Sequence, residues 1–231
     1  MRTITLAEMR TAARQYADQE NSQFVSDAEL TRIINNSIAE LYDLLLSTGE
    51  DYNLSSITFN LVPGTSVYNL PTDFYKLKGV DLKIDNAQSI ALKRYNFNER
   101  NLNNTLIFNG ITNLRYRDEN NTIKFTPKPS TTNEITVHYA PHAVKLSADS
   151  DTFNGYNGWE EYVIVNAAIF CLQKEESDVS VLMMQKQGFI NRINAMAANR
   201  DMANPETITD RNKNNNNPFG SGWGNFGDWN T

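Results

Sequence analysis

The spacing of the hydrophobic residues changes twice along this chain of 231 residues. Towards both ends, apolar side chains recur at intervals of three and four, which is typical of amphipathic helices. Between them, apolar and polar side chains alternate, which is typical of half-buried strands. The pattern predicts an α+β protein: a mainly antiparallel helix bundle interrupted by a β-rich module, with an extended C-terminal arm. The expected parts are the N-terminal helices of the bundle (1–55), the β-rich module (56–145), the C-terminal helices (146–204) and the low-complexity arm (205–231).

Two helices are expected in the N-terminal part. Thr5 with Glu8, and Ser26 with Glu29, have the spacing of capping boxes. A break at Asn21-Ser22 separates the helices, and Gly49 has the position of a glycine that ends a helix. The expected apolar face of the first helix contains Leu6, Met9, Ala13 and Tyr16. That of the second contains Leu30, Ile33, Ile34, Ile38, Leu41, Tyr42 and Leu45.

Short strands are expected in the middle part. Alternation places Ile57, Phe59 and Leu61 on one face, and Pro63-Gly64 follows as a turn. Further strands are predicted at 67–71, 77–84, 105–108, 122–126 and 134–139. The last two are expected to form a hairpin around the loop 127–133, with inward-facing Ile123, Phe125, Ile135, Val137 and Tyr139. The asparagine-rich segment 86–121 has little periodicity and is expected to consist mostly of loops.

Two more helices are expected in the C-terminal part. Asn157 with Glu160 resembles a third capping box, and Ser177 is expected to cap the last helix. The third helix carries Trp159, Tyr162, Val163, Asn166, Ile169 and Phe170 at helical spacing. The fourth carries Leu182, Met183, Lys186, Phe189, Ile190, Ile193 and Met196. Burial is expected above all for Trp159, Ile169, Phe170, Phe189 and Ile193.

The charge is unevenly distributed along the chain. The formal net charge is −6, which argues against a protein that grips nucleic acid independently of its sequence, because that function needs a basic face. The segments 1–75, 76–145 and 146–231 carry −6, +5 and −5. The single cysteine excludes an intrachain disulfide. With no apolar run of membrane-spanning length and no signal-peptide pattern, the protein is expected to be made in the cytoplasm without membrane contact.

The sequence contains no recognisable catalytic, cofactor or metal motif. His138 and His142 lack a third ligand nearby, and Cys171 is expected to be a small buried hydrophobic residue. Asp149 and Asp151 fail the spacing of a calcium loop and are interpreted as an acidic lead into the third helix. A solvated surface explains the acidic Glu160, Glu161, Glu175 and Glu176. The expectation is a protein that is not an enzyme and needs no cofactor.

Three stretches resemble the head-to-tail adaptor proteins of tailed bacteriophages, including the tail tubular protein A type. The first is the extended run 67–74, with the order tyrosine, x, leucine, proline, x, aspartate, phenylalanine. The second combines 126–129 with 135–141, and the third runs from Asp151 through Trp159-Glu160-Glu161-Tyr162 to 174–178. A long helix ending near Arg200-Asp201 follows. The resemblance spans residues 1–204, but the segment 86–121 within this range and the tail 205–231 show no pattern of the family.

This resemblance implies a structural virion protein of the neck or tail. Such a protein forms a homo-oligomeric ring of twelve copies that joins the portal protein to further tail proteins and continues the DNA channel. DNA is then only a passing cargo, and the acidity of the chain suits a channel wall that does not trap it.

Two other interpretations concern binding. The alternative function is a carbohydrate- or receptor-binding virion module, in which Tyr52, Tyr68, Tyr75, Tyr95 and Trp223 could line a sugar site. In the low-complexity tail, glycines separate four aromatic residues, and aromatic side chains are favoured interface anchors. These residues predict an arm that becomes ordered on a partner: Phe219, Trp223, Phe226 and Trp229.

Overall fold

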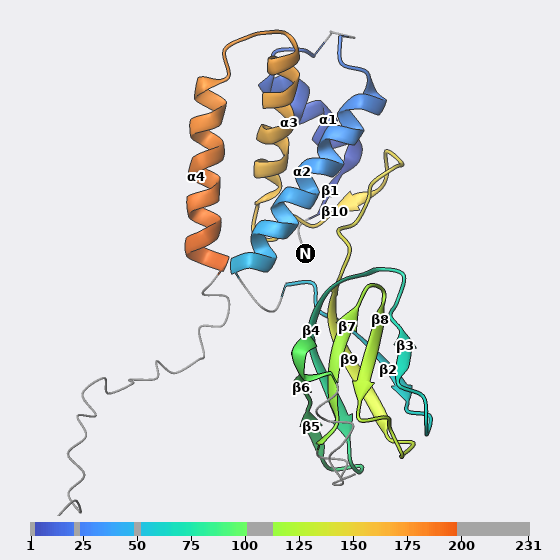
Figure 1. Ribbon diagram of the computed structural model, residues 1–231. Coiled ribbons are helices and arrows are strands. Elements are labelled where there is room, and N and C mark those ends of the chain that lie inside the picture. The colour runs from blue at the N-terminus through green and yellow to red at the C-terminus, as the bar shows by residue number, and fades with distance from the viewer. Residues whose placement is uncertain (1–2, 21–23, 49–51, 101–112, 198–231) are drawn as a thin grey trace, which may run out of the picture. The chain divides into compact units, whose positions relative to one another are not determined.

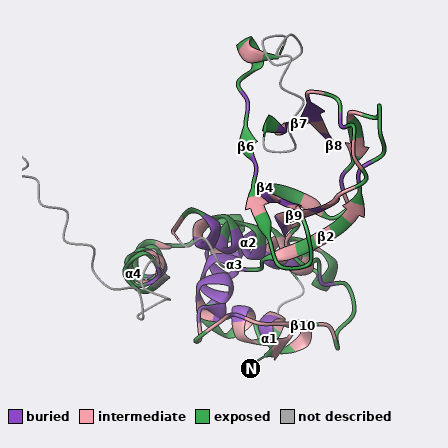
Figure 2. Ribbon diagram, turned by 90° about the horizontal axis from the view of Figure 1, so that it is seen from below, coloured by how far each residue is buried: buried purple, intermediate pink, exposed green. Residues whose placement is uncertain are grey.

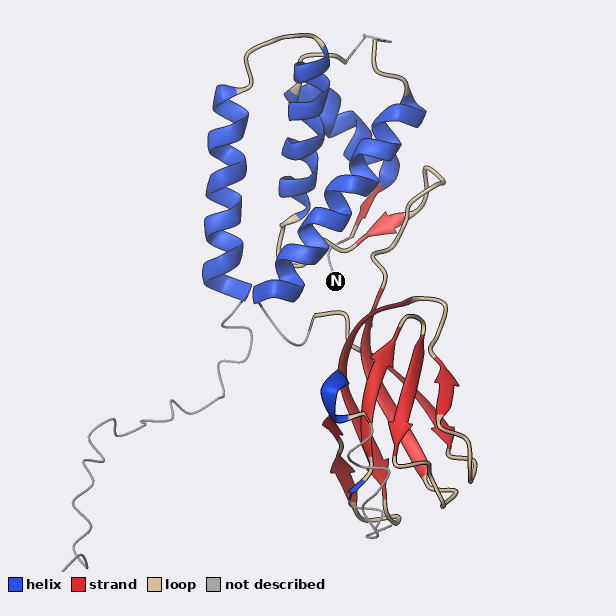
Figure 3. Ribbon diagram, viewed as in Figure 1, coloured by secondary structure: helices blue, strands red, loops and turns tan. Residues whose placement is uncertain are grey.

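A computed structural model of the protein describes residues 3–20, 24–48, 52–100 and 113–197 (Figure 1). The described chain is an α+β protein with four α-helices and mainly antiparallel sheets (Figure 3). The helices are α1 (Leu6–Tyr16), α2 (Asp27–Thr48), α3 (Glu160–Lys174) and α4 (Ser180–Ala197), and a short 3-10 helix spans Phe97–Glu99. All longer strands lie between α2 and α3 in the sequence. The expected break at 21–22, Gly49, the strand at 105–108 and the tail lie outside the described residues.

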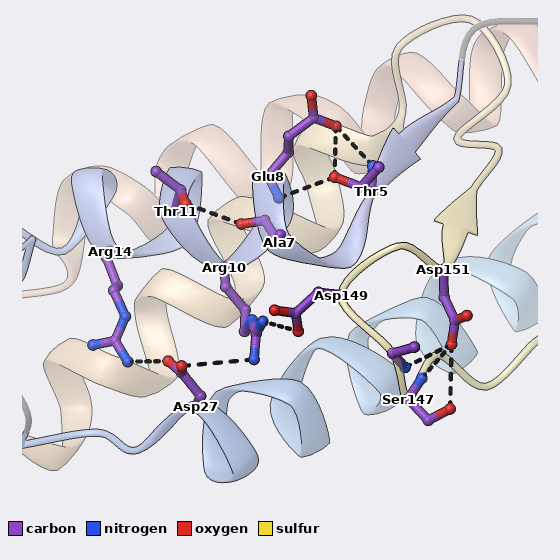
Figure 4. Close-up of polar contacts among 11 residues, drawn as sticks. Thr5, Ala7, Glu8, Arg10, Thr11, Arg14, Asp27, Ser147, Asp149 and Asp151 are labelled. Atoms are coloured by element: carbon purple, nitrogen blue, oxygen red, sulfur yellow. Dashed lines mark hydrogen bonds and ion pairs between the residues drawn. The ribbon is translucent and has the colours of Figure 1, made fainter.

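The N-terminal helices begin largely as their sequences indicate. The Thr5 hydroxyl accepts a hydrogen bond from the Glu8 backbone N–H at 3.2 Å, and the Glu8 carboxylate accepts from the Thr5 N–H at 2.8 Å. This reciprocal pair confirms the capping box of α1 (Figure 4). At α2, the Ser26 hydroxyl accepts from the Glu29 N–H at 3.3 Å, which is half of the expected pair.

Loss of the α1 cap is expected to be measurable on its own. Replacing Thr5 by alanine removes the acceptor for the Glu8 N–H and should lower the free energy of unfolding by about 1 kcal/mol. Thr11 is a matched control in the same helix, because its hydroxyl bonds only to the Ala7 carbonyl within the helix. Alanine is a better helix former than threonine, so Thr11→Ala should not destabilise the protein. Equal losses for both variants in urea denaturation would contradict the role of the cap.

The C-terminal helices begin differently from the prediction. The N-cap of α3 is Trp159, which makes no side-chain capping bond, so the expected Asn157–Glu160 box is wrong. At α4, the Asp178 carboxylate accepts from the Ser180 N–H at 3.0 Å, so Asp178 rather than Ser177 supports the first turn. Both errors have one cause: several residues near each start have capping chemistry, and tertiary packing selects among them.

The helices share one hydrophobic core built from both ends of the described chain. α3 packs against α1, α2 and α4 and is buried on nearly all sides (Figure 2). Trp159, Ile169 and Ile193 are buried as expected. Phe170 is 42% exposed and Phe189 is only partly buried, so their expected burial is wrong or incomplete. The sequence also places Met183, Met184 and Met196 where core residues are expected, and this expectation is wrong, since α4 leaves all three exposed.

The strands form two four-stranded sheets. In one the order is β2-β9-β4-β5, and in the other β3-β8-β7-β6. Among the described strands, only β6 and β7 run parallel. The strands of the first sheet are β2 (Ser55–Asn60), β4 (Phe74–Lys83), β5 (Ser89–Ala91) and β9 (Glu134–Pro141). Those of the second are β3 (Val67–Asn69), β6 (Lys93–Arg94), β7 (Arg115–Glu119) and β8 (Thr122–Thr126). A separate pair joins β1 (Ile4–Thr5) to β10 (Thr152–Phe153).

The expected hairpin of β8 and β9 is wrong. β8 pairs with β3 and β7, whereas β9 pairs with β2 and β4 in the other sheet. The predicted inward faces are nevertheless confirmed, because all five residues are buried: Ile123, Phe125, Ile135, Val137 and Tyr139. Four of them, all except Tyr139, belong to a second hydrophobic core, whose buried residues in the described part of the chain lie between 61 and 137. The loop 127–133 therefore crosses between sheets instead of closing a hairpin.

The segment 86–121 is more ordered than its composition indicates. It contains β5, β6, the 3-10 helix and β7, although residues 101–112 lie outside the described part. β7 reads RYRDE, and only Tyr116 on it is buried. The charged side chains of β7 obscure the alternation that would predict a strand, and β7 is stabilised by its pairing with β8.

Candidate functional site

The two histidines have separate partners. His138 Nε2 lies 3.1 Å from Asp81 Oδ2 on the neighbouring strand, and the His142 ring lies 5.7 Å from the Tyr75 ring. In the described residues, no three histidine, cysteine or acidic side chains come together as a metal site would require. The histidines therefore act in contacts between side chains of the fold.

Cys171 is a packing residue of α3. Its side chain is fully buried in the helical core, and burial raises the pKa of the thiol. A thiol with a raised pKa is a poor nucleophile at neutral pH. This position confirms the expectation of a small buried hydrophobic residue.

The glutamates at the start of α3 differ from each other. Glu160 is only 2% exposed, so its assignment to a solvated surface is wrong. It packs where Gly155 leaves space for its carboxylate, since a β-carbon at Gly155 would collide with it. Glu161 is 3.4 Å from the Tyr16 hydroxyl, which donates to it and has a raised pKa because of burial and this carboxylate. The sequence could not separate these two neighbours, because only tertiary packing covers one of them.

A cluster of charges connects α1, the start of α2 and the loop 147–151 (Figure 4). Arg10 forms an ion pair with Asp149, and Arg14 donates to Asp27 at 2.8 Å. Both arginine side chains are largely covered, with exposed fractions of 14% and 15%. The hydrogen bond from Arg14 lowers the pKa of Asp27. Asp149 is thus a partner of α1 instead of a lead into α3.

Asp151 stabilises the same loop from within. Its carboxylate accepts from the N–H groups of Ser147 at 2.7 Å and Ala148 at 2.8 Å. These backbone bonds hold the pKa of Asp151 below its ordinary value. β10 and a turn separate Asp151 from α3, so its interpretation as an acidic lead into that helix is wrong.

A buried polar network lies between α2, α3 and α4. The Asn166 amide, 1% exposed, donates to the Ser37 hydroxyl at 2.8 Å and to the Glu40 carboxylate at 3.1 Å, and accepts from Lys186 at 2.7 Å. Tyr162 also donates to Glu40 at 3.2 Å. Burial and the neighbouring carboxylate raise the pKa of Tyr162. The only feature of the sequence that indicates this network is Asn166, a single polar residue within the apolar face of the third helix.

Tyr42 of α2 contacts the end of β9. Its hydroxyl donates to the Pro141 carbonyl at 2.5 Å, and its ring packs with Leu46 and Ala140. Next to it, the Tyr75 hydroxyl donates to Asp43 at 2.6 Å. A cavity of about 240 Å³ adjoins Tyr42, with a mainly apolar lining that includes Leu41, Val144 and Phe153. These contacts connect the helices to the strand region.

The titration of Tyr42 predicts a loss of stability in alkali. Burial raises the pKa of its phenol from 10 to about 12. Because the fold favours the neutral phenol, its contribution is complete below about pH 10 and is lost as the pH rises towards 12. We expect the free energy of unfolding to fall over this interval, and less steeply in Tyr42→Phe. Urea denaturation at several pH values from 9 to 12 measures both slopes, and identical slopes would contradict the prediction.

The tyrosines proposed for a sugar site do not form one site. Tyr52 packs edge-on against Tyr156, with ring centroids 5.2 Å apart, and is buried in the helical core. Tyr68 stacks on Phe59 at 4.9 Å, beside the strand core, and Tyr75 contacts Asp43. Tyr95 is buried. Trp223 and the predicted arm residues Phe219, Phe226 and Trp229 lie outside the described residues.

Large apolar side chains are exposed in two regions that are suited to protein contacts. One is α4, with Val181, Met183, Met184 and Met196. The other surrounds β2 and β3, with Leu54, Val62 and Val67. None of the helices in the described part of the chain combines the length and hydropathy needed to cross a membrane. The candidate functional features of the described residues are therefore these two exposed apolar surfaces.

Residues 4–211 match the SU10 adaptor protein family. No curated protein matches the chain significantly. The family match covers all four helices and both sheets, and it confirms the expectation of a phage adaptor, a structural component of the virion. Because the match extends over far more than half of its length, the chain belongs to the SU10 adaptor protein family.

Proposed function

We propose that this protein forms the ring that joins the portal to the tail and continues the DNA channel, as adaptors of the tail tubular protein A type do. The observation that carries this proposal is the family match over residues 4–211. Twelve copies would form the ring, with the portal protein on one side and further tail proteins on the other. DNA would pass through this ring during ejection without being bound.

The two hydrophobic cores indicate separate roles for the helical and the strand regions of the chain. The helices of segments 1–55 and 146–204 would form one bundle, since their core combines residues from both. The β-rich module 56–145 has its own core and would present contact surfaces to neighbouring proteins. The acidic end segments 1–75 and 146–231, at −6 and −5, and the basic middle 76–145, at +5, permit complementary contacts between subunits.

The tail would add a portal-binding arm. A stretch rich in asparagine and glycine cannot bury enough apolar surface to fold alone, but its spaced aromatic residues can anchor it to a partner. These residues are Phe219, Trp223, Phe226 and Trp229. The alternative of a carbohydrate- or receptor-binding module has no comparable support, because its described tyrosines are dispersed.

Mass measurement of the purified protein, alone and mixed with a portal ring, tests the proposal. We expect a complex containing one portal ring and twelve copies of the chain. A truncation after Pro205 should keep the melting temperature of the full chain but dock poorly. Failure of the full chain to bind the portal would overturn the proposed function, whereas equal docking of the truncated chain would overturn only the arm.

A further inference from the structure

β2 is an edge strand with unused backbone groups. β9 is the only strand paired with it among the described residues. The Leu61 N–H donates to the Asn133 carbonyl at 2.9 Å and continues the register of this pair. Hydrogen-bonded and non-hydrogen-bonded pairs alternate in an antiparallel ladder, so Ser56, Thr58 and Asn60 direct their N–H and C=O groups away from the sheet. In the described part of the chain, these groups have no backbone partner.

This edge lacks the protection that edge strands usually carry. β2 reads SSITFN, without charge, proline or a register shift. Natural proteins protect edges by charge, proline, bulges or short length, because an open edge pairs with other strands. The other edges of the described sheets are short: three residues in β3 and β5, and two basic residues in β6. β2 is thus the edge best suited to accept another strand.

The strand core is also incompletely covered where it borders β2. Ile57 and Phe59 face the strand core but are only partly buried. Phe59 stacks on Tyr68 of β3, which is partly buried as well. Leu54 and Val62, at the two ends of β2, have exposed fractions of 51% and 53%. A strand added beside β2 would cover these side chains and satisfy the free backbone groups together.

We propose that β2 pairs with β2 of a second copy of this chain, antiparallel and centred on Thr58. In this register Thr58 faces Thr58 of the other copy, and Ser56 faces Asn60. Each outward-directed residue then meets an outward-directed residue, so all the free groups exchange hydrogen bonds. Ile57 faces Phe59 on the core side, which continues the apolar layer from one copy into the other.

The absence of charge favours a second copy as the occupant. A two-fold contact places identical strands against each other, so a charged strand would oppose like charges. β2 carries none, and its solvent-facing side chains are short and polar. A two-fold contact does not by itself build a ring. The β2 pair is therefore a dimer of the free protein, separate from the proposed ring on the portal.

Sedimentation of the free protein over a range of concentrations tests for this dimer. We expect a reversible change from 26.2 kDa to twice that mass. One strand pair buries less than a standard interface, so the dissociation constant should be on the order of tens of micromolar. A mass that stays at 26.2 kDa up to several times this concentration would overturn the proposal.

Charge variants test the register. One variant carries Ser56→Lys with Asn60→Lys, and the other carries Ser56→Asp with Asn60→Asp. Each variant alone opposes like charges twice and should dimerise about tenfold more weakly or worse. Their mixture opposes Lys to Asp and should form heterodimers about as tight as the unaltered dimer. That recovery also shows that both variants are folded.

A matched control places two lysines on the opposite edge of the same sheet. Ser89→Lys with Ala91→Lys alters exposed residues of β5 and should leave the dimer unchanged. Unchanged dimerisation of either β2 variant, no recovery in the mixture, or disruption by the β5 control would each overturn the proposed contact.

Discussion

Replacing Phe125 by alanine is expected to lower the free energy of unfolding by about 3–5 kcal/mol. The ring is 1% exposed and lies in the strand core. It contacts Tyr68 edge-on, with ring centroids 5.7 Å apart, and Phe59 at 6.5 Å. Its removal leaves a cavity that strands held in two sheets cannot easily close. Urea denaturation of both proteins measures the difference.

Phe170 is the control for this change. Its ring on α3 is 42% exposed, so Phe170→Ala should cost only about 1 kcal/mol. Sequence periodicity alone, strand alternation at Phe125 and helical spacing at Phe170, predicts burial and therefore a large cost at both positions. Equal losses at Phe125 and Phe170 would show that Phe170 is covered in solution and that the described helix packing is wrong.

Replacing Asn166 by aspartate is expected to cost about 2–4 kcal/mol at neutral pH. The change keeps the size of the side chain but replaces a donor by an acceptor. It removes the hydrogen bonds to Ser37 and Glu40 and places a negative charge beside the Glu40 carboxylate, which Lys186 only partly offsets. Thermal and urea unfolding at pH 7 measure the loss.

Asn191→Asp on α4 provides the matched control. Asn191 is exposed, and its side-chain oxygen accepts from Gln187 at 3.1 Å, a bond that aspartate retains. The expected change is within about 0.5 kcal/mol. If Asn166→Asp were as mild as this control, the network between the three helices would contribute little to stability.

Features decided by a few neighbouring residues could be predicted from the sequence. The Thr5–Glu8 cap depends on two side chains three residues apart, and the structure contains both of its hydrogen bonds. The apolar face of α2 likewise follows from the spacing of Leu30, Ile34, Ile38 and Leu41, all buried. In the strands, alternation correctly identified which side chains face inward.

Features decided by distant partners could not be predicted in this way. Alternation does not specify which strands pair with each other, so the sequence predicts a hairpin of β8 and β9, although these strands belong to different sheets. Phe170 is exposed although burial is expected, and Glu160 is buried although exposure is expected. α3 has apolar residues on nearly every side, so the elements packed against it decide which positions are covered. The same limit applies to the candidate site. The hydrogen bond from Tyr42 to Pro141 joins residues 99 positions apart, so no local pattern in the sequence predicts it.

The helical core and the strand core can be completed at different stages of protein synthesis. Among the described residues, those buried in the strand core lie between Leu61 and Val137, whereas those buried in the helical core extend from Leu6 to Ile193. During synthesis the strands can therefore assemble while α1 and α2, already made, still lack α3 and α4. Contacts between residues so far apart in sequence form slowly. The first two helices thus leave the ribosome with an uncovered apolar face, and this interval is when the nascent protein is most exposed to aggregation or to chaperone binding.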